Sequence, residues 1–69
     1  LMIKSHWIGA LVREERVKLK LTQKELSRQT GIGINTLRTI EQGFGGVALE
    51  KIEKVLSELG WELDAHPYD

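Results

Sequence analysis

Apolar residues near the N-terminus recur with the spacing of one face of a helix. The residues that recur are Ile8, Leu11, Val12 and Leu19. Their separations of three, four and seven to eight positions predict a first helix over residues 5–18 with one buried stripe. Ser5 precedes this stripe and can cap the start of the helix.

Two short helices joined by a tight turn are predicted next. Thr22 and Glu25 have capping-box spacing. In this motif the Thr22 hydroxyl accepts a hydrogen bond from the Glu25 amide, and the Glu25 carboxylate accepts one from the Thr22 amide. The helix that starts there can run only to about Thr30, because Gly31 can adopt the left-handed conformation that ends a helix. A third helix is predicted over residues 34–42.

A fourth helix is predicted after a glycine-rich break at residues 43–46. Its expected buried stripe consists of Leu49, Ile52, Val55, Leu56 and Leu59. Gly60 follows this stripe and can end the helix.

The last segment changes period. Trp61, Leu63 and Ala65 alternate with polar residues, which predicts a short strand over residues 61–66 that Pro67 stops. Since no other segment has a strand pattern, the simplest partner is the same strand of a second copy across a two-fold axis. We therefore expect an all-α chain of four to five helices whose C-terminal strand pairs in a homodimer.

Length, cysteine content and charge fit a small helical protein. Sixty-nine residues suit one domain over residues 1–69, and the absence of cysteine excludes disulfides and thiolate metal sites. Although the net charge is zero, residues 1–43 have eight lysines and arginines against four glutamates, a net +4, whereas residues 44–69 have a net −4. A basic half suits DNA phosphates and an acidic half suits a protein partner, with an ordinary solvated surface as the alternative.

No constellation of catalytic or metal-binding residues stands out. The sequence has no glycine-rich phosphate loop, nucleophile elbow or catalytic pair of acids, so we expect neither an enzyme nor a cofactor. His6 and His66 stand apart from any cluster with metal-ligand spacing, which predicts no metal site. The longest apolar runs are only a few residues, so a cytoplasmic protein is expected, without a membrane span or export signal.

Residues 22–42 have the spacing of a helix-turn-helix unit. Counted from Gln23, the fifth residue, Ser27, is small where two helices would cross, and the ninth, Gly31, stands at the turn. The tenth, fifteenth and eighteenth residues are the apolar Ile32, Leu37 and Ile40.

The run LTQKELSRQTGIGINTLRTIEQG resembles the Cro/C1-type helix-turn-helix family, and the resemblance covers about residues 8–60. It implies a lambda-repressor-like domain that represses transcription by binding an inverted-repeat operator in double-stranded DNA, and so lies on the nucleoid when bound. The C-terminal run VALEKIEKVLSELGWELDAHP is similar to the HipB-like antitoxin branch, in which a strand completes the dimer. That likeness implies repression of its own operon and a HipA-type kinase toxin as partner.

The third predicted helix should lie in the major groove with its N-terminal residues toward the base edges. The residues expected to contact bases are Ile34, Asn35, Thr36, Arg38 and Thr39. Asn35 can bridge N6 and N7 of adenine, Arg38 can bind O6 and N7 of guanine or a phosphate, and Ile34 can meet a thymine methyl. The alternative is a polar helix face that is merely exposed.

The candidate phosphate ligands are Gln23, Arg16, Lys24 and Gly43. Gln23 opens the second helix, whose positive end attracts phosphate, and the resemblance implies that role. The resemblance also pairs Arg16 with Glu41 as a clamp between the first and third helices. Gly43 stands in a loop that lacks the basic residue of many relatives, so a contact there would use main-chain amides. Lys24 is a general candidate, with simple solvation as its alternative.

Two other functions stay open. The acidic residues 44–69 also suit a protein-interaction module that sequesters a partner, with DNA binding secondary or lost. A Cro-like regulator that is not an antitoxin is the second alternative.

Overall fold

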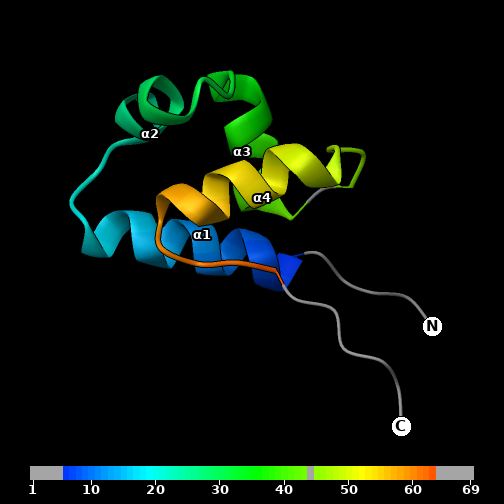
Figure 1. Ribbon diagram of the computed structural model, residues 1–69, viewed down its shortest axis with the longest axis horizontal. Coiled ribbons are helices and arrows are strands. Elements are labelled where there is room, and N and C mark those ends of the chain that lie inside the picture. The colour runs from blue at the N-terminus through cyan, green and yellow to red at the C-terminus, as the bar shows by residue number, and fades with distance from the viewer. Residues whose placement is uncertain (1–5, 44, 64–69) are drawn as a thin grey trace, which may run out of the picture.

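The computed structural model describes residues 6–43 and 45–63, which contain four helices. They are α1 (His6–Lys18), α2 (Gln23–Thr30), α3 (Ile34–Gln42) and α4 (Leu49–Glu58) (Figure 1). The predicted all-α class with four helices is confirmed. The described residues contain no strand, and residues 61–63 of the predicted strand have irregular backbone. Ala65 lies outside the described residues, so strand pairing between two copies stays a prediction.

The helices pack around one core. α1 crosses α3, and α2 packs against both α3 and α4. The buried core residues are Val12, Leu26, Ile32, Leu37, Ile40, Val55, Leu56 and Leu59. Burying one such side chain is worth about 1.5–3 kcal/mol. Leu37 and Ile40 thereby fix which face of α3 is buried, and the opposite face is left to solvent.

Two residues of the predicted buried stripes are exposed instead. Leu19 is 54% exposed because α1 ends at Lys18 and Lys20 adopts a left-handed φ of 59°, which turns the chain away from the stripe. Leu49 is 60% exposed because it is the first residue of α4, and helical side chains tilt toward the N-terminal end of their helix. The predicted burial of both was wrong, and the other stripe residues are buried or half-buried.

Both hydrogen bonds of the predicted capping box are present at the start of α2. The Glu25 amide donates to the Thr22 hydroxyl (3.0 Å), and the Thr22 amide donates to the Glu25 carboxylate (2.9 Å). They satisfy amides that a helix start leaves unpaired. The backbone hydrogen bond from Thr22, more than any other contact, holds the pKa of the Glu25 carboxyl below its ordinary value.

The turn between α2 and α3 is fixed by a glycine and two hydroxyls. Gly31 has a left-handed φ of 75°, and its amide donates to the Ser27 carbonyl (2.9 Å). The Ser27 hydroxyl donates to the Ile32 carbonyl (2.6 Å). The buried Thr30 hydroxyl accepts from the Ile32 amide (3.1 Å) and donates to the Leu26 carbonyl (2.8 Å). These bonds hold α3 at a fixed angle to α2.

Candidate nucleic-acid interface

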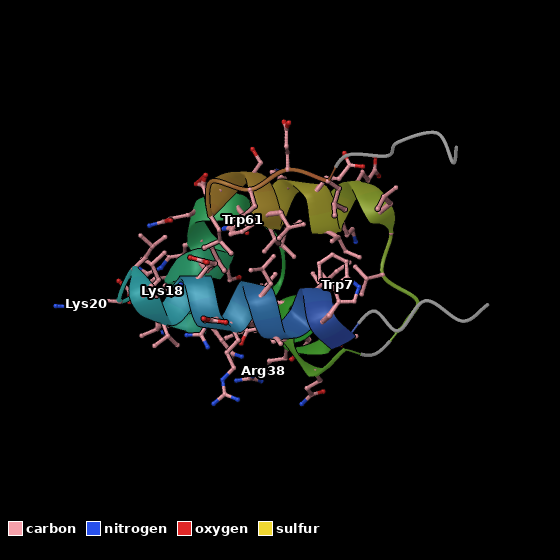
Figure 2. All side chains as sticks on the ribbon, turned by 90° about the horizontal axis from the view of Figure 1, so that it is seen from below. Trp7, Lys18, Lys20, Arg38 and Trp61 are labelled. Atoms are coloured by element: carbon pink, nitrogen blue, oxygen red, sulfur yellow. The ribbon has the colours of Figure 1, made fainter. Side chains whose placement is uncertain are left out.

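The solvent-facing side of α3 holds the residues predicted to contact bases. Asn35 and Arg38 are exposed, and Figure 2 shows Arg38 projecting on the side of the molecule away from α4. The other three are half-buried, namely Ile34, Thr36 and Thr39. Asn35 and Arg38 are thus the most accessible residues of this set.

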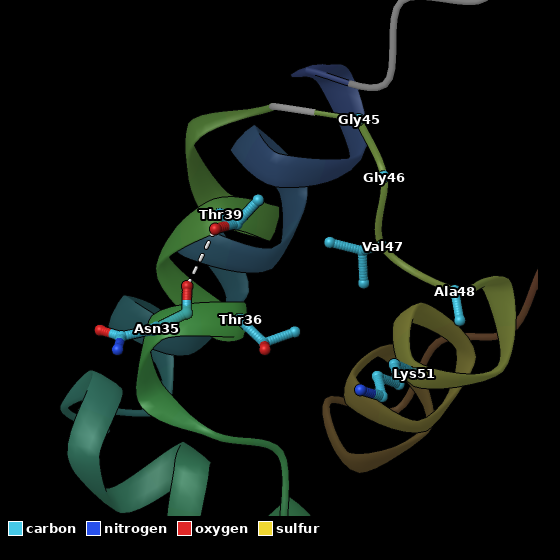
Figure 3. A pocket seen from close by; sticks show the side chains of 8 residues that line it. All are labelled: Asn35, Thr36, Thr39, Gly45, Gly46, Val47, Ala48 and Lys51. Atoms are coloured by element: carbon cyan, nitrogen blue, oxygen red, sulfur yellow. Dashed lines mark hydrogen bonds between the residues drawn. The ribbon is translucent and has the colours of Figure 1, made fainter.

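Asn35 and Thr39 differ in the hydrogen bonds they can offer a base. The Thr39 hydroxyl donates to the Asn35 carbonyl (2.9 Å) (Figure 3), so what it retains for a base is an acceptor and a methyl group. The Asn35 side-chain amide forms no hydrogen bond with another described residue. Its donor and acceptor are therefore both available for an adenine edge.

Arg16 and Glu41 form a two-pronged ion pair that joins α1 to α3. Arg16 Nε donates to Glu41 Oε2 (2.8 Å), and Nη2 donates to Oε1 (3.0 Å). Arg16 Nη1 donates to the Leu21 carbonyl (2.8 Å). The two side chains are only 12% and 4% exposed. Since most of the guanidinium is engaged within the protein, this geometry suits a clamp better than a phosphate ligand.

Gln23 connects this ion pair to Arg38. Its side-chain nitrogen donates to Glu41 Oε1 (3.2 Å), and its side-chain oxygen accepts from Arg38 Nε (3.5 Å). Because Gln23 is the first residue of α2, this contact lies at the positive end of that helix. These hydrogen bonds join the start of α2 to α3.

A groove of about 460 Å³ runs beside this network and is positively charged. It is lined by Arg13, Arg16, Gln23, Arg38, Glu41 and Gln42. Glu41 pairs with Arg16, so the charges of Arg13 and Arg38 are left to attract an anion. Arg13 was not among the predicted site residues, although it precedes Arg16 by three residues and thus lies on the same face of α1.

The other predicted phosphate ligands differ in availability. Lys24 is exposed in the first turn of α2. Gly43 ends α3 with a left-handed φ of 77°, and its amide donates to two carbonyls of that helix. Since that amide already closes α3, the exposed Gly45 and Gly46 are the better main-chain candidates in this loop.

Comparison with known proteins identifies the family. A family model described as helix-turn-helix matches residues 12–65. The chain belongs to this helix-turn-helix family. An uncharacterized HTH-type transcriptional regulator of Sinorhizobium fredii, y4mF, is 37% identical over 57 residues, which cover 83% of this chain and 75% of the relative.

Membership of the helix-turn-helix family makes this chain a DNA-binding transcriptional regulator. The predicted family is therefore confirmed, and so is the prediction that the chain is not an enzyme. The HipB-like branch, the homodimer and the kinase partner stay predictions.

Trp61 and Leu63 are the described residues among those predicted at the dimer contact of this helix-turn-helix protein, and they lie beside α4. The Trp61 amide donates to the Leu56 carbonyl (2.8 Å), and the Trp61 side chain is 46% exposed (Figure 2). Leu63 is half-buried and packs against the chain's own core. Trp61 therefore leaves more apolar surface for a partner than Leu63 does.

The described residues contain neither a candidate metal site nor a membrane-spanning helix. No group of three or more histidines and acids there could hold a metal ion. None of the described helices is long and apolar enough to cross a membrane.

Proposed function

We propose that this helix-turn-helix protein is a repressor that binds an inverted-repeat operator as a homodimer, with α3 of each copy in the major groove. In this proposal it is a HipB-like antitoxin that represses its own operon and binds a HipA-type kinase toxin. The residues assigned to base edges are Ile34, Asn35, Thr36, Arg38 and Thr39. Gln23, Lys24 and Arg13 are assigned to backbone phosphates, and Arg16 to the clamp.

One observation carries the DNA-binding part of this proposal. Gln23 at the start of α2 is hydrogen-bonded both to Glu41 and to Arg38 of α3. A protein that reads a sequence needs base-contacting and backbone-contacting groups in a fixed relation, because the backbone contacts set the register. The Gln23 hydrogen bonds provide that relation.

Symmetry and exposed apolar surface support the homodimer. An inverted repeat presents two half-sites about 34 Å apart, which a two-fold symmetric dimer matches. Trp61 is 46% exposed at the start of the segment predicted to pair between copies. Burying it in a partner would remove this apolar surface from water.

The proposal is tested by fluorescence anisotropy with the chain's own promoter DNA, in competition with scrambled DNA of the same length. Each good base contact is worth about 1–3 kcal/mol, so Asn35→Ala should weaken operator binding by that amount and leave scrambled DNA unaffected. Lys54→Ala, which removes a positive charge from α4 outside the groove that Arg13 and Arg38 line, is the control. Equal affinity of the wild type for both DNAs, or no effect of Asn35→Ala, would overturn the proposal.

The antitoxin part has its own test. A kinase-like protein encoded beside this chain should co-purify with it. The complex of the two proteins should repress their shared operon more strongly than this chain does alone. If no neighbouring product binds a chain that recognises its promoter, the chain is a Cro-like regulator of another kind.

A groove on the acidic half favours the interaction module as a second candidate function. Glu50, Glu53 and Glu62 line this groove of about 390 Å³ together with Trp61 and one positive residue, Lys54. A partner with a positively charged segment suits this surface. Replacing Glu50 and Glu53 of this groove, and the exposed Glu58 of the same helix, by lysine should then weaken partner binding and leave operator affinity unchanged. Unchanged partner binding would rule out this face as the partner's binding site.

A further inference from the structure

A second groove flanks α3 on the side of α4, and none of the phosphate contacts proposed above lies in it. Its volume is about 280 Å³. The residues that line it include Asn35, Thr36 and Thr39 of α3, Gly45 and Gly46 of the loop, and Lys51 of α4 (Figure 3).

Lys51 is the one charged residue among the described residues that line this groove. Its side chain is exposed and points from α4 toward α3 (Figure 3). None of the ion pairs between described residues involves Lys51. The neighbouring Glu50 and Glu53 line the acidic groove with Lys54 instead. The charge of Lys51 therefore faces the α3 side without a carboxylate beside it in the groove.

The loop leaves room for an anion and brings no positive charge of its own. No lysine or arginine stands between Arg38 and Lys51 in the sequence. A Cβ built on Gly45 or Gly46 would meet no atom within 4 Å, so the main chain there is open to approach. Lys51 is thus the first positively charged residue that follows the loop in the sequence.

The two grooves lie on opposite flanks of α3. Arg38 and Gln23 line the first, and Thr36, Thr39 and Lys51 line the second. The major groove is about 12 Å wide, and a helix lying in it has a sugar-phosphate backbone on each side. One positively charged groove on each flank of α3 matches these two backbones.

We propose that Lys51 binds a backbone phosphate of the DNA strand that passes over the second groove. A residue of α4 then supplies the positive charge that the glycine-rich loop lacks. This inference rests on the proposed placement of α3 in the major groove. In the homodimer the contact occurs once in each half-site.

Salt dependence distinguishes a phosphate contact from a base contact. Each neutralised phosphate contributes about 0.9 to the slope of log affinity against log salt concentration. This slope is negative, so Lys51→Met should make it shallower by about 0.9 per half-site and leave the ratio of operator to scrambled-DNA affinity unchanged. Lys54→Met removes the same charge from the other groove and should keep the wild-type slope. Lys51→Arg should restore the slope.

The outcomes separate this site from the proposed function. If the wild type prefers its operator and Lys51→Met does not change the slope, the phosphate site is overturned and the function stands. If the wild type binds DNA without preference, sequence-specific repression fails, and the slopes on scrambled DNA still decide the phosphate site, because a phosphate contact needs no base sequence. A chain that binds no DNA overturns both. Both lysines are exposed, so all variants should have the melting temperature of the wild type.

Discussion

Gly9 of α1 lies directly against the backbone carbonyl of Ile40 in α3. A Cβ built on Gly9 would be 2.8 Å from the carbonyl oxygen of Glu41 and nearer still to that of Ile40. Gly9 is buried, and the atoms it faces belong to a helix backbone, which cannot rotate aside as a side chain can. The crossing of α1 and α3 therefore requires glycine at this position.

We predict that Gly9→Ala destabilises the protein. In a helix free of contacts this change stabilises by about 1 kcal/mol, so the expected sign is the reverse of helix propensity. Forcing a methyl group into a filled contact costs roughly 1–3 kcal/mol. The free energy of unfolding from urea titration measures it, with Gly45→Ala in the open loop as control. A more stable Gly9→Ala protein would show that α1 and α3 are further apart.

The sequence predicted what local signals determine. The capping box and Gly31 gave α2 its two ends, because both act through neighbouring backbone groups. Gly9 was not singled out, since its role depends on α3, which is distant in sequence. Leu19 was misjudged because period alone does not reveal that the chain turns at Lys20.

The buried ion pair between α1 and α3 gives the second prediction. Glu41→Gln leaves the Arg16 guanidinium without its counter-charge at a site where the Arg16 side chain is 12% exposed. Removing one partner of a buried pair costs roughly 3–5 kcal/mol, and chemical denaturation should give a loss of about 3 kcal/mol here. Glu14→Gln breaks the exposed pair with Lys18 (3.6 Å) and should cost under about 1 kcal/mol. Equal losses for both variants would contradict a structural role of the Arg16–Glu41 pair.

The candidate site was predictable only in part. Asn35 and Arg38 were found because helix period places them opposite the buried Leu37 and Ile40. Lys51 was not, because nothing in the sequence reveals that a residue of α4 lines a groove with residues of α3. Family resemblance supplied Arg16 and Glu41, whose separation of 25 residues no local pattern bridges.

The lowered pKa of Glu25 predicts a specific pH dependence. A carboxyl with a folded-state pKa below its unfolded value stabilises the fold above the unfolded pKa, about 4.3, and that contribution is lost as pH falls through the folded pKa. Glu25→Gln should therefore have a lower melting temperature than the wild type at pH 7. This difference, the gap, should shrink as pH falls below about 4.3. The other acids titrate in both proteins and cancel in the difference. A gap that stays constant across this range would mean that the carboxylate charge does not stabilise the cap.

Thr30→Val tests whether the turn hydroxyls hold α3 in place. Thr30 is 3% exposed, and its hydroxyl accepts from the Ile32 amide (3.1 Å) and donates to the Leu26 carbonyl (2.8 Å). Valine has nearly the same shape but leaves that buried amide unpaired, which costs about 1–3 kcal/mol. Thr39→Val removes a hydroxyl whose hydrogen bond to the Asn35 carbonyl is exposed, so its unfolding free energy should stay within about 0.5 kcal/mol of the wild type. Hydrogen exchange of the Ile32 amide should quicken in Thr30→Val alone, and unchanged protection there would place the stabilisation of the turn in Gly31 and Ser27.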